Sequence, residues 1–369
     1  MNIGHVSLTY RPVFGGQDTY IENLKQVLSH RGHKSTVYQA VSLRHKIDKT
    51  GVHAVLTPPG FGRFIANFNW YYFNFFLKFF KSKLAKEDVL IVHYAVHYPA
   101  VKFHPRVIIL SHGIEWHTPA DQWDDALRAR RARETFKKCF VVANDTEYLR
   151  FCGVDIKPAT RFFEEVQPGK WFVPNCVDTE HFKKVTSDQE LAKLKPILVP
   201  RNIYYHRGIH LALEAFGLLV HEGNTENSMV IVGKIVDQEY YKNLLEIIKK
   251  YNIKDRVYFR GHSDWQKMPA LYSASVCTII PTIDCEGTSL SALESMACGT
   301  PVIATSVAGL KDLPCLHSEP EPMALKNALF EMLNKREHYA TRQQNEVIKT
   351  FNLKNWEQAW TKIIEKASV

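Results

Sequence analysis

Strand-like runs rich in apolar residues recur along the chain, and most are followed by a longer amphipathic stretch. These runs cover residues 2–8, 36–41, 88–93, 107–110, 140–143, 197–201, 229–234, 257–262, 276–280 and 302–304. Short runs with few polar interruptions are typical of parallel strands buried on both faces, and the amphipathic stretches predict helices. The alternation predicts an α/β chain built from two Rossmann-like halves.

The intervening stretches predict helices at 18–30, 61–80, 209–219, 239–251, 320–334 and 354–367. The segment from the second run to about residue 59 carries turn signals, so we expect a loop there. Residues 179–195 are polar and charged, which is typical of a linker between domains. The expected domains are therefore 1–182 and 183–348, followed by a C-terminal segment at 349–369.

The stretch 284–310, DCEGTSLSALESMACGTPVIATSVAGL, predicts a turn, a helix, a buried strand and a second turn. Thr288 and Ser289 are candidate N-caps of the helix. A helix start after a glycine turn presents free N–H groups and a partial positive charge, which suits a phosphate. Glu286 and Glu294 bracket this anion site, and carboxylates accept hydrogen bonds from vicinal sugar hydroxyls. The alternative is a surface helix with two solvated glutamates.

Composition limits the class of protein. The chain has 369 residues with 45% apolar content, which is enough for two domains with full cores. A formal charge of +9 indicates an anionic partner. Seven cysteines without paired short spacing indicate reduced thiols in a cytosolic protein, and we expect neither a signal peptide nor a membrane span.

The stretch 284–310 resembles the retaining nucleotide-sugar glycosyltransferases of family four, which have the GT-B fold. The resemblance rests on Glu286 and Glu294 separated by seven residues, on Gly287 and Ser289, and on the following MACGTPVIAT and AGL. It implies two Rossmann-like domains facing across a cleft, with a C-terminal helix that crosses back to the first domain. It also implies that Glu286 contacts donor sugar hydroxyls and that Glu294 contacts the ribose.

Other parts of the chain extend this resemblance. His112, in the motif SHG, would face the donor sugar near the reacting carbon, and Glu115 and His117 would line the acceptor side. The remaining donor-binding candidates are Gly15, Gly16, Gly233, His262, Gly287, Thr288, Ser289 and Leu290. The element PNCVD at 174–178 resembles the family's PNGVD, with Cys176 in place of glycine.

Two cations precede the helix predicted at 209–219. Arg201 ends a strand, and Arg207 stands just before Gly208 at the helix start. Two fixed guanidinium groups suit a diphosphate leaving group, and the resembled family carries arginine and lysine at these places. Surface arginines without a role are the alternative.

Two further segments could meet an anionic membrane surface. Residues 61–86 combine many aromatic rings with a lysine-rich end, and residues 128–138 hold six basic residues among eleven. The alternatives are a core helix that buries its rings and a solvated basic face. We expect no nucleic acid partner, because no recognised binding motif accompanies the charge.

These patterns predict a cytosolic glycosyltransferase, either free or peripheral on the inner face of the membrane. It would move a hexose-type sugar, with retention, from a nucleoside diphosphate sugar such as a UDP-sugar to a glycan, lipid-linked or small-molecule acceptor. No metal or other cofactor is expected, because no DxD motif is visible. Two alternatives remain: a phosphorylase that carries pyridoxal phosphate, and a catalytically silent nucleotide-sugar-binding or scaffold subunit.

Overall fold

The computed structural model describes residues 1–13, 15–42, 51–57, 69–114, 116 and 123–368. The chain forms two compact units. The first comprises Met1–Lys157, Phe162–Asn175 and Leu353–Val369, and the second comprises Pro158–Arg161 and Cys176–Asn352. Each unit has its own sheet and its own apolar core.

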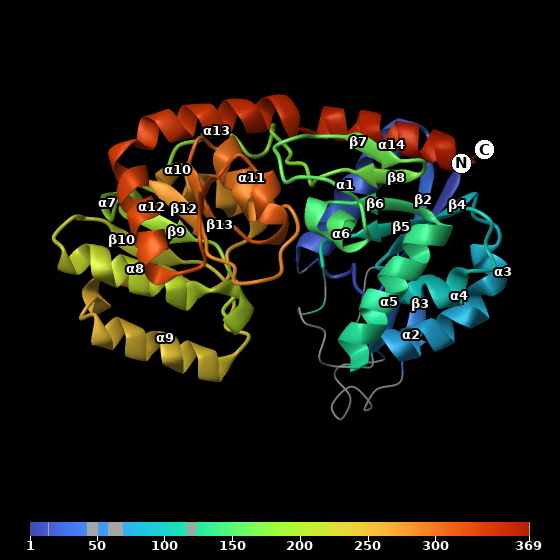
Figure 1. Cartoon of the computed structure of the whole chain (residues 1–369), viewed down its shortest axis with the longest axis horizontal. Helices are drawn as coiled ribbons and strands as arrows, with labels where there is room; N and C mark the ends of the chain where they lie inside the picture. The colour runs from blue at the N-terminus through green and yellow to red at the C-terminus, as the bar shows by residue number, and fades with distance from the viewer. Residues whose placement is uncertain (14, 43–50, 58–68, 115, 117–122, 369) are drawn as a thin grey trace. The chain divides into compact units, whose positions relative to one another are not determined.

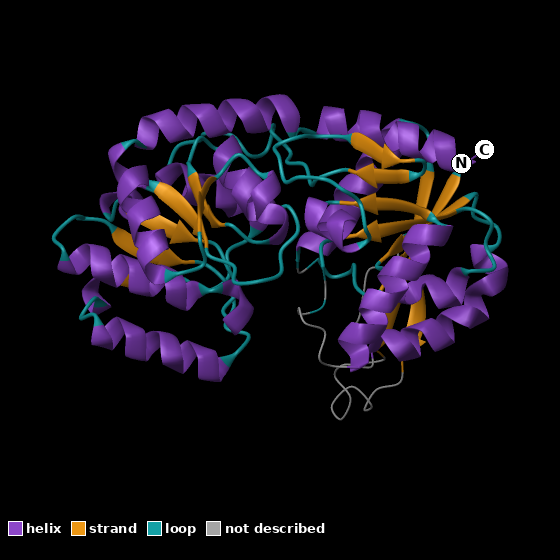
Figure 2. Ribbon diagram, in the orientation of Figure 1, coloured by secondary structure: helices purple, strands orange, loops and turns teal. Residues whose placement is uncertain are grey.

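The first unit is built on an eight-stranded sheet in the order β3-β2-β1-β4-β5-β6-β8-β7 (Figures 1 and 2). Its strands are β1 (Asn2–Ser7), β2 (Lys34–Ser42), β3 (Val52–Thr57), β4 (Val89–His93), β5 (Val107–Ser111), β6 (Phe140–Ala143), β7 (Glu164–Gln167) and β8 (Lys170–Phe172). All neighbours pair in parallel except β7 and β8. Every residue of β4 and β5 is buried, as expected for parallel strands covered on both faces.

Helices cover both faces of this sheet (Figure 1). They are α1 (Gly16–His30), α2 (Asn69–Leu77), α3 (Lys81–Leu84), α4 (Tyr98–Val101), α5 (Trp123–Lys138), α6 (Thr146–Phe151) and α14 (Leu353–Ser368). One face packs against α2 and α5 through Phe73, Leu77 and Phe136. On the other face α1 contacts α14, where the rings of Tyr20 and Trp356 meet edge to face at 4.7 Å.

The second unit has a six-stranded sheet in the order β11-β10-β9-β12-β13-β14. Its strands, parallel in every pair, are β9 (Pro196–Val199), β10 (Ser228–Ile231), β11 (Val257–Phe259), β12 (Cys277–Ile280), β13 (Val302–Thr305) and β14 (Leu316–Ser318). Its helices are α7 (Gln189–Lys193), α8 (Ile209–His221), α9 (Gln238–Lys250), α10 (Met268–Ala274), α11 (Leu290–Ala297), α12 (Pro322–Asn334) and α13 (Arg336–Thr350). Side chains of α8, α9 and α12 form one core cluster, and those of α10, α11 and α13 form another.

The predicted fold class is confirmed, including a C-terminal helix that belongs to the first unit. Two local predictions were wrong, and one helix was missed. The expected loop before residue 59 contains the edge strand β3, and the expected linker at 179–195 contains α7, whose Leu191 is fully buried. Helix α13 was not predicted, because its buried residues Tyr339, Ala340, Gln343 and Val347 lie within a mostly polar stretch.

The aromatic segment buries some of its rings in the core and leaves others exposed, and its contact with a membrane stays a prediction. Helix α2 begins at Asn69, and residues 61–68 of the predicted helix lie outside the described residues. Within α2 and the turn after it, Trp70, Phe73 and Leu77 are buried, while other rings are exposed. No helix within the described ranges is long and apolar enough to cross a membrane.

Candidate functional site

Strand order brings the predicted phosphate-binding residues together in the second unit. Strands β9 and β12 are parallel neighbours, so the residues that follow them lie at the same edge of the sheet. Arg201 follows β9, and the loop after β12 leads to Glu286 and then to α11. Ligands bind at this carboxyl edge in open α/β sheets, and the predicted residues meet there.

A cluster of two arginines and one glutamate forms at this edge. Arg201 is buried, with 7% of its side chain exposed, and its guanidinium lies 3.2 Å from Oε2 of Glu286. It also donates a hydrogen bond to Oγ of Ser289 at 3.1 Å. Arg207 donates to the same Oε2, and the hydroxyl of Thr282 donates to it at 3.3 Å. We call Arg201, Arg207 and Glu286 the arginine cluster.

Charge in the arginine cluster is unbalanced, since two guanidinium groups face one carboxylate and the sum is +1. Burial lowers the pKa of Arg201, whereas the charge of Glu286 raises the pKa of Arg207. Both guanidinium groups remain protonated at neutral pH. The polar contacts of the Glu286 side chain described above all use Oε2. The cluster therefore has an excess positive charge, and the second carboxylate oxygen of Glu286, Oε1, takes no part in those contacts.

Two glycines allow the backbone to pack closely around the arginine cluster. Gly208 has a φ of +66°, and a Cβ there would lie 1.8 Å from the carbonyl oxygen of Pro281. A Cβ at Gly233 would lie 2.1 Å from the carbonyl oxygen of Arg201. Larger residues would therefore displace the loop that carries Arg201 or the turn that follows Arg207.

The helix start next to the arginine cluster matches the predicted anion site. Ser289 is the N-cap residue of α11, yet its side chain makes no capping hydrogen bond and instead accepts from Arg201. Gly287 and Thr288 are buried, and Leu290 is the first helical residue. The side chain of Ser289 therefore does not cap the first N–H groups of α11. These N–H groups lie next to the two guanidinium groups of the arginine cluster.

Glu294 lies farther along α11 and is held by Tyr272 of α10, whose hydroxyl donates to Oε2 at 3.0 Å. Burial raises the pKa of Glu294 to about 7, although the tyrosine hydrogen bond and the charge of Arg201 act in the opposite direction. The side chain therefore changes charge near neutral pH. Perturbed carboxyl groups of this kind are frequent at functional sites.

A cavity of about 570 Å³ in the second unit is lined in part by His262, a predicted donor-binding residue. His262 lines it together with Val232, Arg260 and Leu271. Val232 precedes Gly233, whose N–H donates to the carbonyl of Gly261 at 2.8 Å. Gly233 itself lies against the backbone of Arg201, so one turn of the chain leads from the cavity wall at Val232 to the loop that carries Arg201.

In the first unit, the predicted glycines and His112 lie at the ends of β1 and β5. Gly15 is the N-cap residue of α1 and Gly16 is its first residue; both are exposed. A Cβ at Gly15 would meet no atom within 4 Å, so packing does not require glycine there. Tyr20, one turn into α1, packs edge to face on the ring of His112 at 4.8 Å.

His112 ends a row of three histidines from β1, β4 and β5. Nδ1 of His5 lies 3.4 Å from Nε2 of His93, and Nδ1 of His93 lies 2.9 Å from Nε2 of His112. Burial lowers the pKa of all three, to about 3 for His5 and His112. The three imidazoles are therefore neutral at pH 7, with one N–H each.

The hydrogen-bond direction along this row follows from its buried end. Nε2 of His5 is buried and has no hydrogen-bond partner among the described residues. An orphaned N–H costs more than an orphaned acceptor, so the proton of His5 belongs on Nδ1. His5 then donates to His93 and His93 donates to His112, which places the proton of His112 on Nδ1. His112 can offer that N–H to a ligand.

The predicted acceptor-side residues Glu115 and His117 lie outside the described residues, so their prediction stays open. Cys176, which replaces a family glycine, is buried and is not among the residues with positive φ. Its backbone therefore does not require glycine. No three His, Cys, Asp or Glu side chains in the described part of the chain are grouped to hold a metal ion.

Several residues of the site were not predicted from sequence. The side chains of Thr282, Tyr272 and His93 each contact a predicted residue, and the side chain of His5 contacts His93. Tyr272 lies 22 positions from Glu294 in the sequence, and His5 lies 88 positions from His93. Only the strand order brings the members of each pair close together. The sequence held one signal for the histidine row, because a histidine stands at the end of two predicted strands, which are β4 and β5 in the structure.

Comparison with known proteins identifies the class first. The whole chain superposes on sucrose-phosphate synthase from Thermosynechococcus elongatus with a TM-score of 0.79 and 18% identity, covering 99% of this chain and 98% of that one. It also matches Anabaena HepE in complex with UDP and glucose, with a TM-score of 0.74, 16% identity and 99% coverage of both chains. The fold is that of the GT-B glycosyltransferases.

Sequence comparison then gives the similar proteins. Residues 181–346, which lie in the second unit, match the family model described as Glycosyl transferases group 1. An uncharacterised glycosyltransferase of Methanocaldococcus jannaschii is 29% identical over 119 residues, which are 32% of this chain and 29% of the relative. D-inositol 3-phosphate glycosyltransferase of Salinispora tropica is 41% identical over 68 residues, 18% of this chain and 14% of the relative. The chain thus spans less than a third of either relative. Together with the fold, these matches confirm the predicted resemblance to GT-B glycosyltransferases.

The histidine row predicts a loss of stability in mild acid. A histidine with a folded-state pKa below its unfolded value opposes folding once the unfolded chain becomes protonated, so stability should be complete above pH 6.5 and fall below it. For the fully buried His5 the loss between pH 6.5 and 5 should be about 2 kcal/mol. Denaturant unfolding at several pH values measures it.

His5→Gln should flatten this pH dependence, because it removes one proton-binding group from the unfolded chain while keeping a donor for His93. His338→Gln, at an exposed position on α13, is the matched control and should leave the profile unchanged. Equal unfolding free energies at pH 7 and pH 5 in the unmodified protein would contradict neutral burial of the row.

Proposed function

We propose that this protein is a retaining glycosyltransferase of the family-four type, which transfers a hexose from a nucleoside diphosphate sugar to an acceptor hydroxyl. The observation that carries the proposal is the arginine cluster beside the start of α11. It has a net positive charge, fixed guanidinium donors and N–H groups not capped by Ser289, which are the groups that a diphosphate requires.

Catalysis in this proposal is electrostatic. As the bond between the sugar and the diphosphate breaks, negative charge grows on the phosphate oxygens, and Arg201, Arg207 and the α11 N–H groups stabilise it. The guanidinium groups would take the place of a metal ion. Glu286, with Oε1 outside the contacts to the arginines, would accept hydrogen bonds from sugar hydroxyls, and His112 would donate its Nδ1–H to the sugar.

The donor assignment rests on the second unit and on structural relatives. The cavity beside Gly233 and His262 is large enough for a nucleoside, since ligand pockets commonly measure about 300 to 1,000 Å³. Glu294, which lies within α11 beyond its N-cap residue Ser289, would bind the ribose hydroxyls. Anabaena HepE has been solved with UDP-glucose, which supports UDP as the nucleotide here.

Replacing one arginine tests the leaving-group role. Arg207→Gln should lower kcat/KM by about 30-fold to 1,000-fold, or roughly 2 to 4 kcal/mol of transition-state stabilisation, while the unfolding free energy changes little. Arg207→Lys should recover most of the loss, because it restores the charge. The assay follows UDP release from UDP-glucose, first with water as acceptor and then with glycan acceptors.

The control variant is Arg342→Gln on α13, which removes an exposed arginine of the same unit and should keep normal kinetics. Near-normal turnover in Arg207→Gln would remove this residue from the mechanism. Tight UDP-glucose binding without any turnover would favour the silent-subunit alternative.

Glu294→Gln should act in opposite directions on stability and on binding. The raised pKa means that the unfolded chain ionises first, so folding stability falls as pH rises from about 4.5 through 7. At pH 8 the amide should therefore stabilise the free protein by about 1 to 2 kcal/mol, allowing for partial exposure. UDP affinity should fall about tenfold, because the ribose loses a charged acceptor.

Calorimetric titration with UDP and denaturant unfolding at pH 8 measure the two effects. Glu246→Gln, an exposed carboxylate on α9, is the matched control. Unchanged UDP affinity in Glu294→Gln would place Glu294 outside the nucleotide site, whatever its effect on stability.

For the acceptor, we propose a membrane-bound, lipid-linked molecule at the inner face of the membrane. The support is a stripe of rings spaced four residues apart: Tyr71, Phe75 and Phe79 are 58%, 53% and 73% exposed. Lysines 78, 81, 83 and 86 follow or accompany it. Exposed aromatic rings beside lysines suit the interface of an anionic bilayer.

The double variant Phe75→Ser/Phe79→Ser should abolish sedimentation with phosphatidylglycerol vesicles, and raising the salt concentration should weaken sedimentation of the unmodified protein. Phe330→Ser, on α12 of the second unit and 44% exposed, is the control and should sediment normally. Failure of the unmodified protein to bind vesicles at low salt would reject a membrane-bound acceptor.

A further inference from the structure

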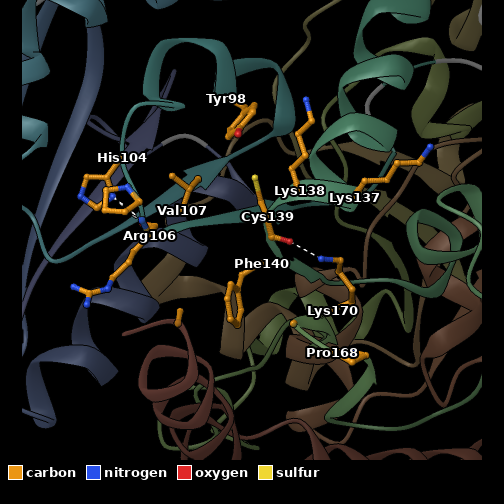
Figure 3. A pocket seen from close by; sticks show the side chains of 13 residues that line it. Tyr98, His104, Arg106, Val107, Lys137, Lys138, Cys139, Phe140, Pro168 and Lys170 are labelled. Atoms are coloured by element: carbon orange, nitrogen blue, oxygen red, sulfur yellow. Dashed lines mark hydrogen bonds between the residues drawn. The ribbon is translucent and has the colours of Figure 1, made fainter. Parts of the chain in front are cut away.

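The first unit has a second cavity, at the opposite edge of its sheet from His112. Residues at the starts of β5, β6 and β8 line it, whereas His112 follows the end of β5. The cavity measures about 430 Å³, and Figure 3 shows its lining side chains. Nothing in the proposed glycosyl transfer uses this edge, because the donor residues lie at carboxyl ends of strands.

Positive charge dominates this cavity. Its lining contains no carboxylate but four cationic side chains. These are Arg106 before β5, Lys137 and Lys138 at the end of α5, and Lys170 at the start of β8. Lys138 forms an exposed ion pair with Glu134 at 3.1 Å. Arg106, Lys137 and Lys170 form no ion pair with any residue that the structure describes.

Helix stability explains two of these cations at most. Lys137 and Lys138 lie in the last turn of α5, where positive charge is favourable to any helix. Arg106 and Lys170 lie on other elements and need a separate reason. Four cations contributed by three separate segments of the chain line one hollow. In Figure 3 the ammonium of Lys170 points toward Cys139, whereas the charged ends of Arg106, Lys137 and Lys138 point in different directions.

Lys170 is the informative residue. Its ammonium donates to the carbonyl oxygen of Cys139 at 2.6 Å and lies 5.5 Å from the centre of the Phe136 ring. Burial lowers its pKa. A partly desolvated ammonium that contacts a neutral carbonyl and a ring gains more from an added anion than a solvated surface lysine does.

We propose that this cavity binds a small phosphate-bearing anion at Lys170, with the exposed side chains of Arg106 and Lys137 turning toward the anion when it binds. Phosphate offers several oxygens to donors that arrive from different directions, and arginine can hold two of them at once. The cavity is the size of a small-molecule site and is too small to enclose a nucleic acid duplex. A soluble phosphate compound and a phospholipid headgroup share this chemistry.

The test titrates sodium pyrophosphate into the full-length protein by calorimetry, with the unmodified protein compared with Lys170→Met. Lys170→Met should weaken the affinity about tenfold or more, because it removes a charged donor and keeps the length of the side chain. Arg106→Gln should also weaken the affinity for pyrophosphate. It serves as the test variant if Lys170→Met fails to fold. Pyrophosphate that binds at the arginine cluster contributes equally to all variants, so only the differences count.

Lys102→Met is the matched control, since Lys102 is exposed in the same unit and does not line the cavity. It should leave pyrophosphate binding unchanged. Without ligand, Lys170→Met should melt within a few degrees of the unmodified protein, because it trades one hydrogen bond for the removal of a desolvated charge.

A parallel sedimentation assay uses vesicles of phosphatidylglycerol and of phosphatidylcholine. Lys170-dependent binding of pyrophosphate alone supports a soluble ligand, and Lys170-dependent binding of phosphatidylglycerol vesicles supports a headgroup; either result supports the site. If Lys170→Met and Arg106→Gln both bind pyrophosphate and vesicles as the unmodified protein does, the proposal is overturned.

Discussion

The buried guanidinium of Arg201 constrains the loops at the carboxyl edge of the second sheet. A charge with 7% exposure needs an anion and hydrogen-bond acceptors close by, and Glu286 and Ser289 supply them. Gly233 lets the neighbouring turn pack against the same loop, and the parallel pairing of β9 with β12 brings the partners together. The same contacts that make this charge tolerable in the free protein leave it ready for a phosphate.

The first unit uses different chemistry at the equivalent edge of its sheet. Its polar row consists of neutral imidazoles whose burial keeps them unprotonated, and their order fixes which nitrogen of His112 carries the proton. A neutral donor suits contact with an uncharged sugar. Fixed cations suit a phosphate group, so the two units present different chemistry at the carboxyl edges of their sheets.

The sequence was most informative where chemistry and local pattern coincide. Consecutive apolar residues in β4 and β5 identified buried strands, and the stretch after β12 identified Glu286, Ser289 and the start of α11. Partners distant in sequence could not be predicted, because Tyr272 and His93 acquire their roles only through strand order. The edge strand β3 and the polar helix α13 were missed since each has only a weak apolar periodicity.

Helix α14 has a consequence for how the chain is made. The first unit takes most of its residues from the beginning of the sequence, yet Trp356 and Trp360, both fully buried, come from α14. While the ribosome is still translating the second unit, the surface of α1 around Tyr20 lacks this cover. A chain in which α14 has not yet been made therefore exposes an aromatic surface, and such a surface favours aggregation until the helix packs on it.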